Sequence, residues 1–565
     1  MILPNLIDPP ALTPGHPAGP ADHLSTNLAP SSLTPQEQLN RGIIHTDISR
    51  PLAVAITIGF LAIIAAIPLM QAAVEYRRQK HIQAMEVLQH FPSTTNLHGF
   101  EKDLEKESIP RTSVQPGVQW AITRIGGFGN SKGVVGDDGW LFYQPGVDYL
   151  IGPGVLDEGN MSVKRKDVTG SGKVISHPDP RLAILQFAAQ CRAAGARLVL
   201  MPIPDKAMLQ PAQLTCRMKF DAPIAPPNNP DFERLLAELR AAGVDVFYPA
   251  PAVIAPGEIR FLAQDTHWTP QWMEQVAGAL AQHVETAVTL SPRMTKPLVG
   301  KDQHVSRIGD LVDMLKLPAD QTNYPPQTVT VRRIEAGKGE PWQPRRDAEV
   351  LLLGDSFSNI YSVEAMGWGE SAGLAEQLSF SLQRPVDRIS RNDAGAYATR
   401  QMLAGELARG RNRLAGKKGV VWEFAIRELQ VGDWKPIEMK LGTPAPSRFV
   451  VPKHGEHVRV TGTIESIALP PRPGTVPYKD HIIAMHLIDL QSSDPKIAGG
   501  EALVYVWSMR NNEWTATARY REGQPITLQL SPWSDVSGKL DAINRRDLDD
   551  ETLNLEEPCW GEETK

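Results

Sequence analysis

The chain has 565 residues, which is too long for one ordinary hydrophobic core and indicates two or three domains. Hydrophobic residues make up 42% and charged residues 22%, as in a mostly globular protein, and the formal net charge of -6, without any basic arginine-aromatic tract, excludes an evident nucleic-acid partner. The three cysteines, Cys191, Cys216 and Cys559, form no CxxC pair and no zinc spacing, so no metal site is predicted. One disulfide plus one free thiol remains open.

The N-terminal region divides into a tail and an apolar segment. Residues 1–50 are rich in proline, with serine, threonine and asparagine between, which predicts a disordered tail. Residues 51–75 follow, and no residue from Leu52 to Val74 is charged. Because roughly 20 helical residues span the hydrocarbon core of a bilayer, this segment predicts one transmembrane anchor. A buried soluble helix and a signal peptide cleaved after Ala73 are the alternatives.

The charges that flank this segment bear on its orientation. Arg41 and Arg50 precede it, whereas Arg77, Arg78 and Lys80 follow it. The positive-inside rule therefore leans by one charge against export of the C-terminal body, although large domains translocate largely regardless of such a margin.

The middle of the chain predicts a layered α/β domain at residues 116–440, after an amphipathic juxtamembrane helix and polar connector at residues 76–115. Asp138 and Gly139 supply a turn between two short strands. From about residue 180, helices and strands alternate, which predicts a mostly parallel sheet with helices on both faces. The segments are PRLAILQFAAQCRAAGA, a helix that ends near Gly195; RLVLMPIPDK, a strand; DFERLLAELRAAGVDVFYPA, a helix and a strand; and the strands AEVLLLGDSF and GVVWEFAIRE.

The C-terminal region, residues 441–565, has a different character. Short alternating or β-branched segments are separated by turn residues, which predicts a small all-β domain, an antiparallel barrel or a sandwich. Its aromatic residues are interpreted as core rather than as a sugar-stacking platform. The segments are HVRVTGTIESIAL, DHIIAMHLIDL, EALVYVWSMR, EWTATARYR and QPITLQLSPW.

The apolar stretch LLLGDSFSNIY ends in a glycine, a carboxylate and a hydroxyl. Ser356 would lie at the carboxyl end of a strand, where open α/β sheets gather their ligands. Gly354 allows a sharp turn that would lift the serine hydroxyl clear of the sheet. The backbone N–H groups around Ser356 would then face a space in which an oxyanion could form. A turn that merely leaves the core is the alternative.

A serine nucleophile needs a base, and the stretch FLAQDTHWTP supplies one. Thr269 as N-cap and Pro270 as first helical residue predict a helix that begins there, so Asp265 and His267 lie in the preceding loop. Two positions apart, the carboxylate can reach the imidazole Nδ1–H and leave Nε2 free for Ser356, which is the arrangement of a serine triad. An exposed turn with an anion site at the helix N-terminus is the alternative.

Together, DTHW (265–268) and GDSF (354–357) resemble the SGNH-hydrolase-like domain of alginate O-acetyltransferases. The order also resembles that family, because Asp-x-His precedes the serine here, whereas ordinary SGNH esterases place the serine first. The resemblance covers roughly residues 115–430. Further similar blocks, in the family's order, are DGWLFY (138–143), PIPDK (202–206), GDLVDML (309–315) and VVWEF (420–424).

The resemblance implies a role for each matched position of the triad. Ser356 would carry an acetyl group as a covalent ester. His267 would act as general base and then as general acid, and Asp265 would hold His267. Transfer to a sugar hydroxyl would release the enzyme.

The resemblance also implies a further oxyanion donor in the stretch RNDAGAYATRQ. Tyr397 is the candidate, with Gly395 and Asn392 nearby; packing at a helix start is the alternative for the tyrosine. Glu423 and Arg427 would orient the site from the next strand, or would form an ion pair with each other.

The family typically modifies exported polysaccharide outside the inner membrane and receives acetyl groups from a membrane-bound O-acyltransferase. The resemblance therefore implies a single-pass inner-membrane protein with its catalytic domain in the periplasm and no cofactor. The long proline-rich N-terminus and the C-terminal β domain depart from the family pattern. The latter is more similar to an OB-type barrel than to the family's carbohydrate-binding module.

The predicted function is membrane-anchored O-acetylation of an exopolysaccharide, alginate or another. Two alternatives remain open: an acetyl esterase of the same fold, because water and a sugar hydroxyl compete for one acyl-enzyme, and a non-catalytic polysaccharide-binding scaffold.

Overall fold

The chain separates into two compact units, Met1–Arg78 and Gln79–Lys565, each described here by itself. Most of the predicted tail (1–48) and of the predicted juxtamembrane segment (78–108) lies outside the described residues. The computed structural model describes residues 49–77, 109–166, 175–215, 222–392, 394–408, 410–443, 449–471, 473, 476, 478–548, 550 and 553–563.

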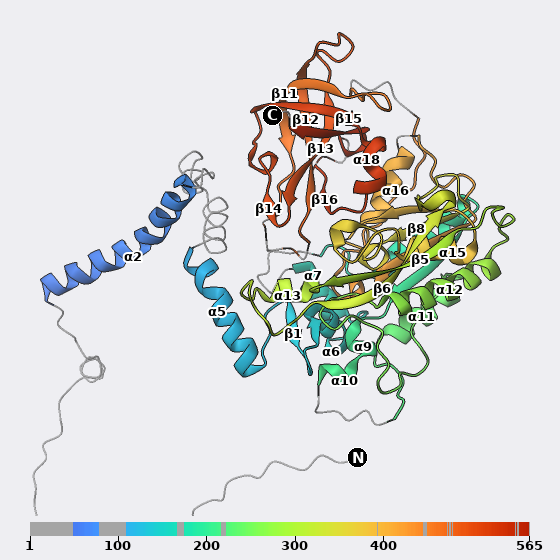
Figure 1. Cartoon of the computed structure of the whole chain (residues 1–565), viewed down its shortest axis with the longest axis horizontal. Helices are drawn as coiled ribbons and strands as arrows, with labels where there is room; N and C mark the ends of the chain where they lie inside the picture. The colour runs from blue at the N-terminus through green and yellow to red at the C-terminus, as the bar shows by residue number, and fades with distance from the viewer. Residues whose placement is uncertain are drawn as a thin grey trace, which may run out of the picture. The chain divides into compact units, whose positions relative to one another are not determined.

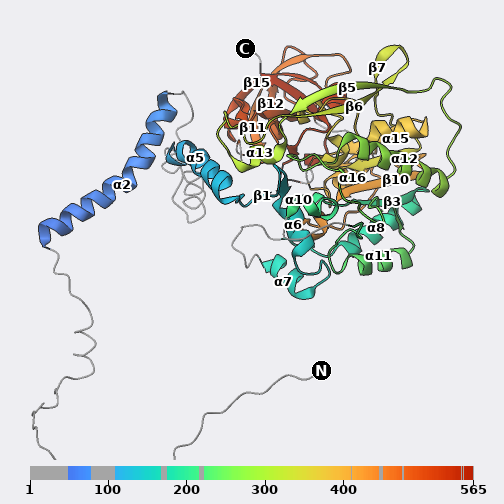
Figure 2. The same ribbon diagram turned by 60° about the horizontal axis from the view of Figure 1, so that its bottom comes forward.

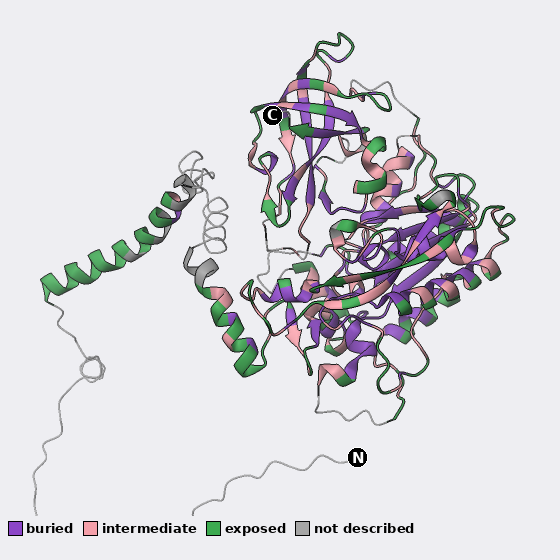
Figure 3. Ribbon diagram, in the orientation of Figure 1, coloured by how far each residue is buried: buried purple, intermediate pink, exposed green. Residues whose placement is uncertain are grey.

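The described part of the first unit is one helix, α2 (Arg50–Arg77). Its segment Arg50–Ala73 is 24 residues long and, by length and composition, is apolar enough to cross a membrane. Most of its described side chains are exposed (Figure 3). The apolar helix predicted at residues 51–75 is confirmed, whereas its insertion in a membrane stays a prediction.

The second unit contains a five-stranded sheet in the order β4-β3-β10-β8-β9. Strand β8 of this sheet is labelled in Figure 1. All four pairings are parallel, which confirms the predicted parallel sheet. Every residue of β8 and β10 is buried, which is why their sequences are almost continuously apolar rather than alternating. The strands are β3 (Arg197–Ile203), β4 (Asp245–Val246), β8 (Val350–Gly354), β9 (Val386–Ser390) and β10 (Gly419–Ala425).

Helices cover both faces of this sheet. The connections β3 to β4 and β8 to β9 run in opposite directions along the strand order, so right-handed crossovers put their helices, α11 and α15, on opposite faces. Helix α12 packs against α15, and α8 packs against β3 and α11 (Figure 2). The carboxyl ends of β3, β10 and β8, where the direction reverses, form the crevice in which open sheets bind ligands. These helices are α8 (Pro180–Ala193), α11 (Phe232–Ala241), α12 (Pro270–Ala287), α15 (Leu374–Leu382) and, between β9 and β10, α16 (Ala398–Ala408).

The local signals behave as their chemistry predicts. The Thr269 hydroxyl accepts a hydrogen bond from the Trp272 N–H at 3.3 Å, so Thr269 is the N-cap of α12 and Pro270 its first residue. Gly195, just beyond α8, has a φ of 82°, a conformation that suits glycine. Asp138 and Gly139 also have positive φ and form the predicted turn between β1 (Gly133–Val135) and β2 (Leu141–Tyr143).

Several smaller elements surround the sheet. An antiparallel sheet of β5 (Val299–Arg307), β6 (Gln327–Ala336) and β7 (Glu340–Pro341) has no counterpart in the sequence prediction. The remaining helices of this region are α5 (Ile109–Gly126), α6 (Gln144–Ile151), α7 (Glu158–Lys166), α9 (Lys206–Leu209), α10 (Pro211–Leu214), α13 (Asp310–Leu315), α14 (Ser356–Asn359), α17 (Glu428–Val431) and the 3-10 turns η1 (Gly337–Gly339) and η2 (Glu364–Met366).

The C-terminal strands pair in a closed ring, β11-β12-β13-β17-β15-β11, around their own hydrophobic cluster. The predicted purely antiparallel pairing is wrong at two places, because β17 is parallel to β13 and β16 is parallel to β12. The segment EWTATARYR forms mainly a turn and a short 3-10 helix rather than a strand. The elements are β11 (Val458–Ile467), β12 (His481–Gln491), β13 (Ala502–Arg510), β14 (Glu513–Trp514), η3 (Thr517–Arg519), β15 (Pro525–Pro532), α18 (Trp533–Leu540), β16 (Arg545–Arg546), η4 (Leu553–Leu555) and β17 (Pro558–Glu563).

Candidate active site

Ser356 is the first residue of α14 and lies directly beyond the carboxyl end of β8. Asp355 caps this short helix by accepting the Phe357 N–H at 2.8 Å. Gly354 is needed at the turn, since a Cβ there would lie 2.2 Å from the Ser358 hydroxyl oxygen. The strand thus ends in a tight, capped turn that holds the serine at the sheet edge.

Glu423, in the neighbouring strand β10, holds this turn in place through hydrogen bonds. Its Oε2 accepts the Asp355 N–H at 2.9 Å and the Ser358 hydroxyl at 2.5 Å. Burial, and then the proximity of Asp355, raise the pKa of Glu423 well above its ordinary value. Asp355 also accepts the Ala425 N–H at 2.8 Å, so three hydrogen bonds join β10 to the serine turn. Glu423 therefore orients the turn, as one of its two predicted readings requires.

His267 is held by Asp265 in the loop before α12. The imidazole Nδ1 lies 2.6 Å from Asp265 Oδ1, and the His267 N–H donates to the same oxygen at 3.1 Å. Asp265 Oδ2 accepts the Asp310 N–H at 3.0 Å and the Trp368 Nε1–H at 2.9 Å. Burial alone would raise the pKa of Asp265, but the hydrogen bond and charge of His267 lower it overall. Asp265 is therefore the ionised orienting group that a triad requires.

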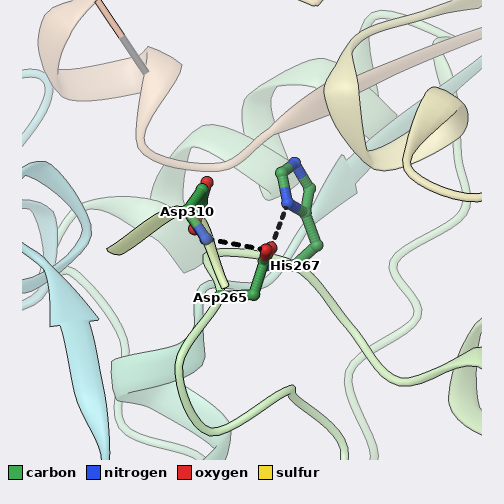
Figure 4. A group of neighbouring side chains, drawn as sticks. All are labelled: Asp265, His267 and Asp310. Atoms are coloured by element: carbon green, nitrogen blue, oxygen red, sulfur yellow. Dashed lines mark hydrogen bonds and ion pairs between the residues drawn. The ribbon is translucent and has the colours of Figure 1, made fainter. Parts of the chain in front are cut away.

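Asp310 forms a second carboxylate beside this pair (Figure 4). It accepts the Thr266 N–H at 2.8 Å and the Thr266 hydroxyl at 2.7 Å. Burial, and then the charge of Asp265, raise the pKa of Asp310 to about 6. The quoted block GDLVDML contains Asp310, but its partnership with the Asp265 loop is not readable from sequence.

Asp265, His267 and Asp310 also bring ligand atoms within 4.8 Å of one another, the spacing of a metal site. All four carboxylate oxygens, however, already accept hydrogen bonds from N–H or O–H groups. A cation would have to displace these donors, so the arrangement fits an oriented histidine better than a metal centre.

The structure brings the two loops, about 90 residues apart in the chain, to one cavity of about 550 Å³. Ser356, His267 and Asp265 all line it. The loops are tied by the Trp268 Nε1–H, which donates to the Phe357 carbonyl at 3.1 Å. His267 Nε2 is buried and has no hydrogen-bond partner among the described residues. The nitrogen that a general base uses is thus unengaged and makes no hydrogen bond to Ser356, although both residues line the same cavity.

Of the three predicted oxyanion residues, only Asn392 belongs to the described lining of the cavity. Asn392 lines the cavity; its amide accepts a hydrogen bond from Asn359 at 2.7 Å and donates to the Met366 sulfur at 3.3 Å. The described lining of the cavity does not include Gly395, whose carbonyl accepts the Trp422 Nε1–H, or Tyr397. The Tyr397 ring instead lies 4.5 Å from the Lys435 ammonium, just before α16, in line with the packing alternative.

Arg427 also lines the cavity, beyond the carboxyl end of β10. It donates to Asp205 Oδ2 at 3.1 Å, and its guanidinium lies 5.1 Å from the centre of the Tyr143 ring. The alternative of an ion pair with Glu423 is therefore wrong, since each residue bonds elsewhere.

Lys206, in the quoted block PIPDK, is a buried cation that the sequence analysis did not single out. Its ammonium donates to the Leu141 carbonyl at 2.7 Å and to the Ala263 carbonyl at 3.2 Å, two residues before Asp265. Burial lowers the pKa of Lys206 to about 7. The residue thus joins the β1–β2 hairpin to the loop that bears the Asp-His pair.

The C-terminal strand region supplies another part of the cavity lining. Residues 478–480, just before β12, line it together with Ile543 and Asn544, just before β16. No sequence signal pointed to these residues.

The described cysteines are unreactive free thiols. Cys191 and Cys559 are buried free thiols, and burial raises the pKa of each to about 12. Neither therefore takes part in the disulfide left open above, and Cys216 lies outside the described residues.

Comparison with known proteins gives concordant matches. Residues 134–426, a little over half of the chain, match the family described as SGNH hydrolase-like domain, acetyltransferase AlgX. A probable alginate O-acetylase, AlgJ of Pseudomonas aeruginosa, is 26% identical over 353 residues, which cover 59% of this chain and 79% of that protein.

Among solved structures, the O-acetyltransferase domain of Pseudomonas putida AlgJ is 21% identical, with a TM-score of 0.39. The match covers 54% of this chain and 94% of the AlgJ chain. AlgX of Pseudomonas aeruginosa is 15% identical, with a TM-score of 0.37, and the match covers 73% of this chain and 93% of the AlgX chain.

Proposed function

Since the chain belongs to the AlgX acetyltransferase family of SGNH hydrolase-like domains, we propose that it is an O-acetyltransferase that modifies polysaccharide hydroxyls through an acyl-enzyme on Ser356. One observation carries the mechanism: His267, oriented by Asp265, has an unengaged Nε2 in the cavity that Ser356 lines. A relative named as a probable alginate O-acetylase supports the choice of a polysaccharide acceptor.

In the first half-reaction, His267 Nε2 accepts the Ser356 hydroxyl proton while Oγ attacks the acetyl carbonyl of the donor. The ionised Asp265 keeps the proton of the neutral imidazole on Nδ1 and stabilises the imidazolium that forms. His267 then protonates the leaving group of the donor, and the acetyl group remains on Ser356 as an ester.

The tetrahedral intermediates need donors for their oxyanion. The N-terminus of α14, which begins at Ser356, and the Asn392 amide are the proposed donors. The Asn392 N–H₂ group donates only to a thioether, which is a weak acceptor, so a developing oxyanion would be a stronger partner for it.

In the second half-reaction, a sugar hydroxyl enters the same cavity and gives its proton to His267 Nε2 while its oxygen attacks the ester carbon. The Ser356–acyl bond breaks, and the proton passes from His267 to Ser356 Oγ. The serine is thereby regenerated, and the acetyl group ends on the sugar.

The cellular setting follows from the apolar helix and the family context. Helix α2 would anchor the chain in the inner membrane, with the second unit in the periplasm. A membrane-bound O-acyltransferase would supply the acetyl groups, and an exported polysaccharide would accept them. The closed ring of C-terminal strands, with five members, is proposed to be an OB-type barrel.

The decisive experiment uses the full chain in detergent, an activated aryl acetate as donor, and alginate-derived and cellulose-derived oligosaccharides as acceptors. Mass spectrometry should detect acetylated oligosaccharide. Ser356→Ala should lower kcat/KM by at least about three orders of magnitude, because it removes the nucleophile.

Release of acetate without any acetylated sugar would instead favour an esterase. Full function of Ser356→Ala would leave only a binding scaffold.

A further inference from the structure

Asn544, in the C-terminal strand region, is one of the residues that line the catalytic cavity, and its side-chain amide has no hydrogen-bond partner in the described part of the chain. The residue is only 1% exposed, and both its Oδ1 and its Nδ2 lack a hydrogen bond among the described residues. Buried amides in native proteins are nearly always hydrogen-bonded, and an unpaired one is costly. An unpaired amide on the wall of a reaction cavity therefore indicates a polar ligand.

The backbone around Asn544 is well fixed, so the position of the amide is not accidental. The Asn544 carbonyl accepts the Ile482 N–H at 2.9 Å, and β16 pairs with β12 immediately afterwards. Residues 478–480, which also line the cavity, directly precede β12. Both cavity-lining segments thus lie at the same end of one strand.

Arg391 ties this wall to the catalytic region. Its guanidinium donates to the Arg545 carbonyl, next to Asn544, and pairs with Asp547 at 3.4 Å. Arg391 also directly precedes Asn392, the proposed oxyanion donor, which lines the same cavity. The contact between Arg391 and Arg545 therefore connects the two parts of the cavity wall. Asn392, the proposed oxyanion donor, is next to Arg391 in the chain, and Asn544 is next to Arg545.

The chemistry of the amide identifies its ligand. An asparagine side chain is neutral, donates through N–H₂ and accepts through its carbonyl oxygen, so it complements a sugar hydroxyl, which does both. A cavity of about 550 Å³ has the size of a small-ligand site. A purely apolar or ionic ligand would leave one of the two amide functions unsatisfied.

We propose that Asn544 binds a hydroxyl of the acceptor sugar next to the one that is acetylated, so that the C-terminal strand region completes the acceptor site. This inference rests on the proposed function. During transfer, the attacking hydroxyl oxygen bonds to the acetyl carbon, the Ser356 ester bond breaks, and the proton reaches Ser356 through His267. Asn544 takes no part in these bond changes: it is a positioning residue that favours the sugar over water.

The test separates the two half-reactions in the full-length protein. Asn544→Ala and Asn544→Leu remove both amide functions, and Leu also keeps the volume. Both variants should hydrolyse p-nitrophenyl acetate at the parental rate, because the triad is intact. With alginate-derived oligosaccharides, the acceptor KM should rise about tenfold, as expected for one or two lost hydrogen bonds, and the ratio of transfer to hydrolysis should fall equally.

The matched control is Gln529→Ala, which removes an exposed amide from β15, in the same strand ring but outside the described cavity lining. It should change neither quantity. Parental acceptor KM and partition ratio in both folded Asn544 variants would overturn the inference, and so would a loss of p-nitrophenyl acetate hydrolysis, because that would assign Asn544 a structural role. Failure of the unsubstituted protein to acetylate any sugar would instead refute the proposed function.

Discussion

The parallel sheet and the C-terminal strand ring contribute to the same cavity in different ways. The sheet presents Ser356 and Arg427 just beyond the carboxyl ends of two neighbouring strands. The turn that bears Ser356 is held to β10 through Asp355, and Arg427 is held by Asp205. The strand ring presents a wall in which the Asn544 amide is buried and makes no hydrogen bond to any residue that the structure describes. The difference teaches that the first region holds its reactive groups through protein contacts alone, whereas the second contains a polar group that the described protein residues leave unsatisfied and that the proposed sugar ligand would engage.

The largest effect should come from the triad. Asp265→Asn should lower kcat for p-nitrophenyl acetate hydrolysis by about 10³ to 10⁴, because an amide favours the wrong imidazole tautomer. Steady-state kinetics of the full chain measures this. Asp302→Asn, which changes an exposed carboxylate on β5, is the control and should leave kcat unchanged. A loss below about tenfold for Asp265→Asn would remove the sheet region from the chemistry.

An intermediate effect should come from Lys206, the buried lysine that bonds to the loop bearing Asp265 and His267. Lys206→Met should lower activity by about tenfold to a hundredfold through misplacement of that loop. It should also change how stability depends on pH. Burial lowers the pKa of Lys206 to about 7, whereas the pKa of a lysine in an unfolded chain is about 10.4.

Between these two pH values the unfolded chain binds more protons than the folded one, so the free energy of unfolding of the parent should increase from pH 7 to pH 9 by about 1 to 2 kcal/mol. Urea unfolding at both pH values should show this rise in the parent and in the Lys301→Met control, an exposed lysine on β5, but not in Lys206→Met. Equal slopes in all three proteins would contradict the account.

The smallest effect should come from the rim of the strand ring. Lys479 pairs with Asp313 at 2.8 Å, but the two side chains are 42% and 51% exposed. A double-mutant cycle of Lys479→Ala and Asp313→Ala should therefore give a coupling energy below about 0.5 kcal/mol. A coupling above about 2 kcal/mol would mean that the rim, and not the Arg391 contact, joins the wall to the catalytic region.

The part of the site that could be predicted from the sequence is the part encoded locally. The two-residue spacing of Asp265 and His267, the Thr269 cap and the Gly354 turn each act over a few residues, and the structure contains all of them. The parallel sheet was equally predictable, because strands buried on both faces leave long apolar runs in the sequence.

The remaining support of the triad could not be predicted, because it comes from distant residues. Asp265 receives hydrogen bonds from Asp310 and Trp368, which lie 45 and 103 residues further along the chain. One of these donors is a backbone N–H, which any residue offers, so it leaves no mark in the sequence. The Tyr397 prediction failed for a related reason: proximity in sequence to Asn392 does not fix the direction of the ring, which packs on Lys435.

In the strand ring, individual strands were predictable but their closure was not. Strand β17 has the short sequence PCWGEE, with little alternation, and is ordered by pairing with β13 and β15. The role proposed for Asn544 depends on the pairing of β16 with β12 and on the contact through Arg391, neither of which has a local signature.

The central claim is that Ser356 carries the acetyl group. It is tested most directly by rapid acid quench of the full chain with p-nitrophenyl acetate, proteolysis, and mass spectrometry of the peptide that contains Ser356. We predict a mass increase of one acetyl group on Ser356, absent in Ser356→Ala, and its disappearance when an acceptor oligosaccharide is added before the quench. Turnover of the donor with no acetyl group on Ser356 at any quench time would contradict the account.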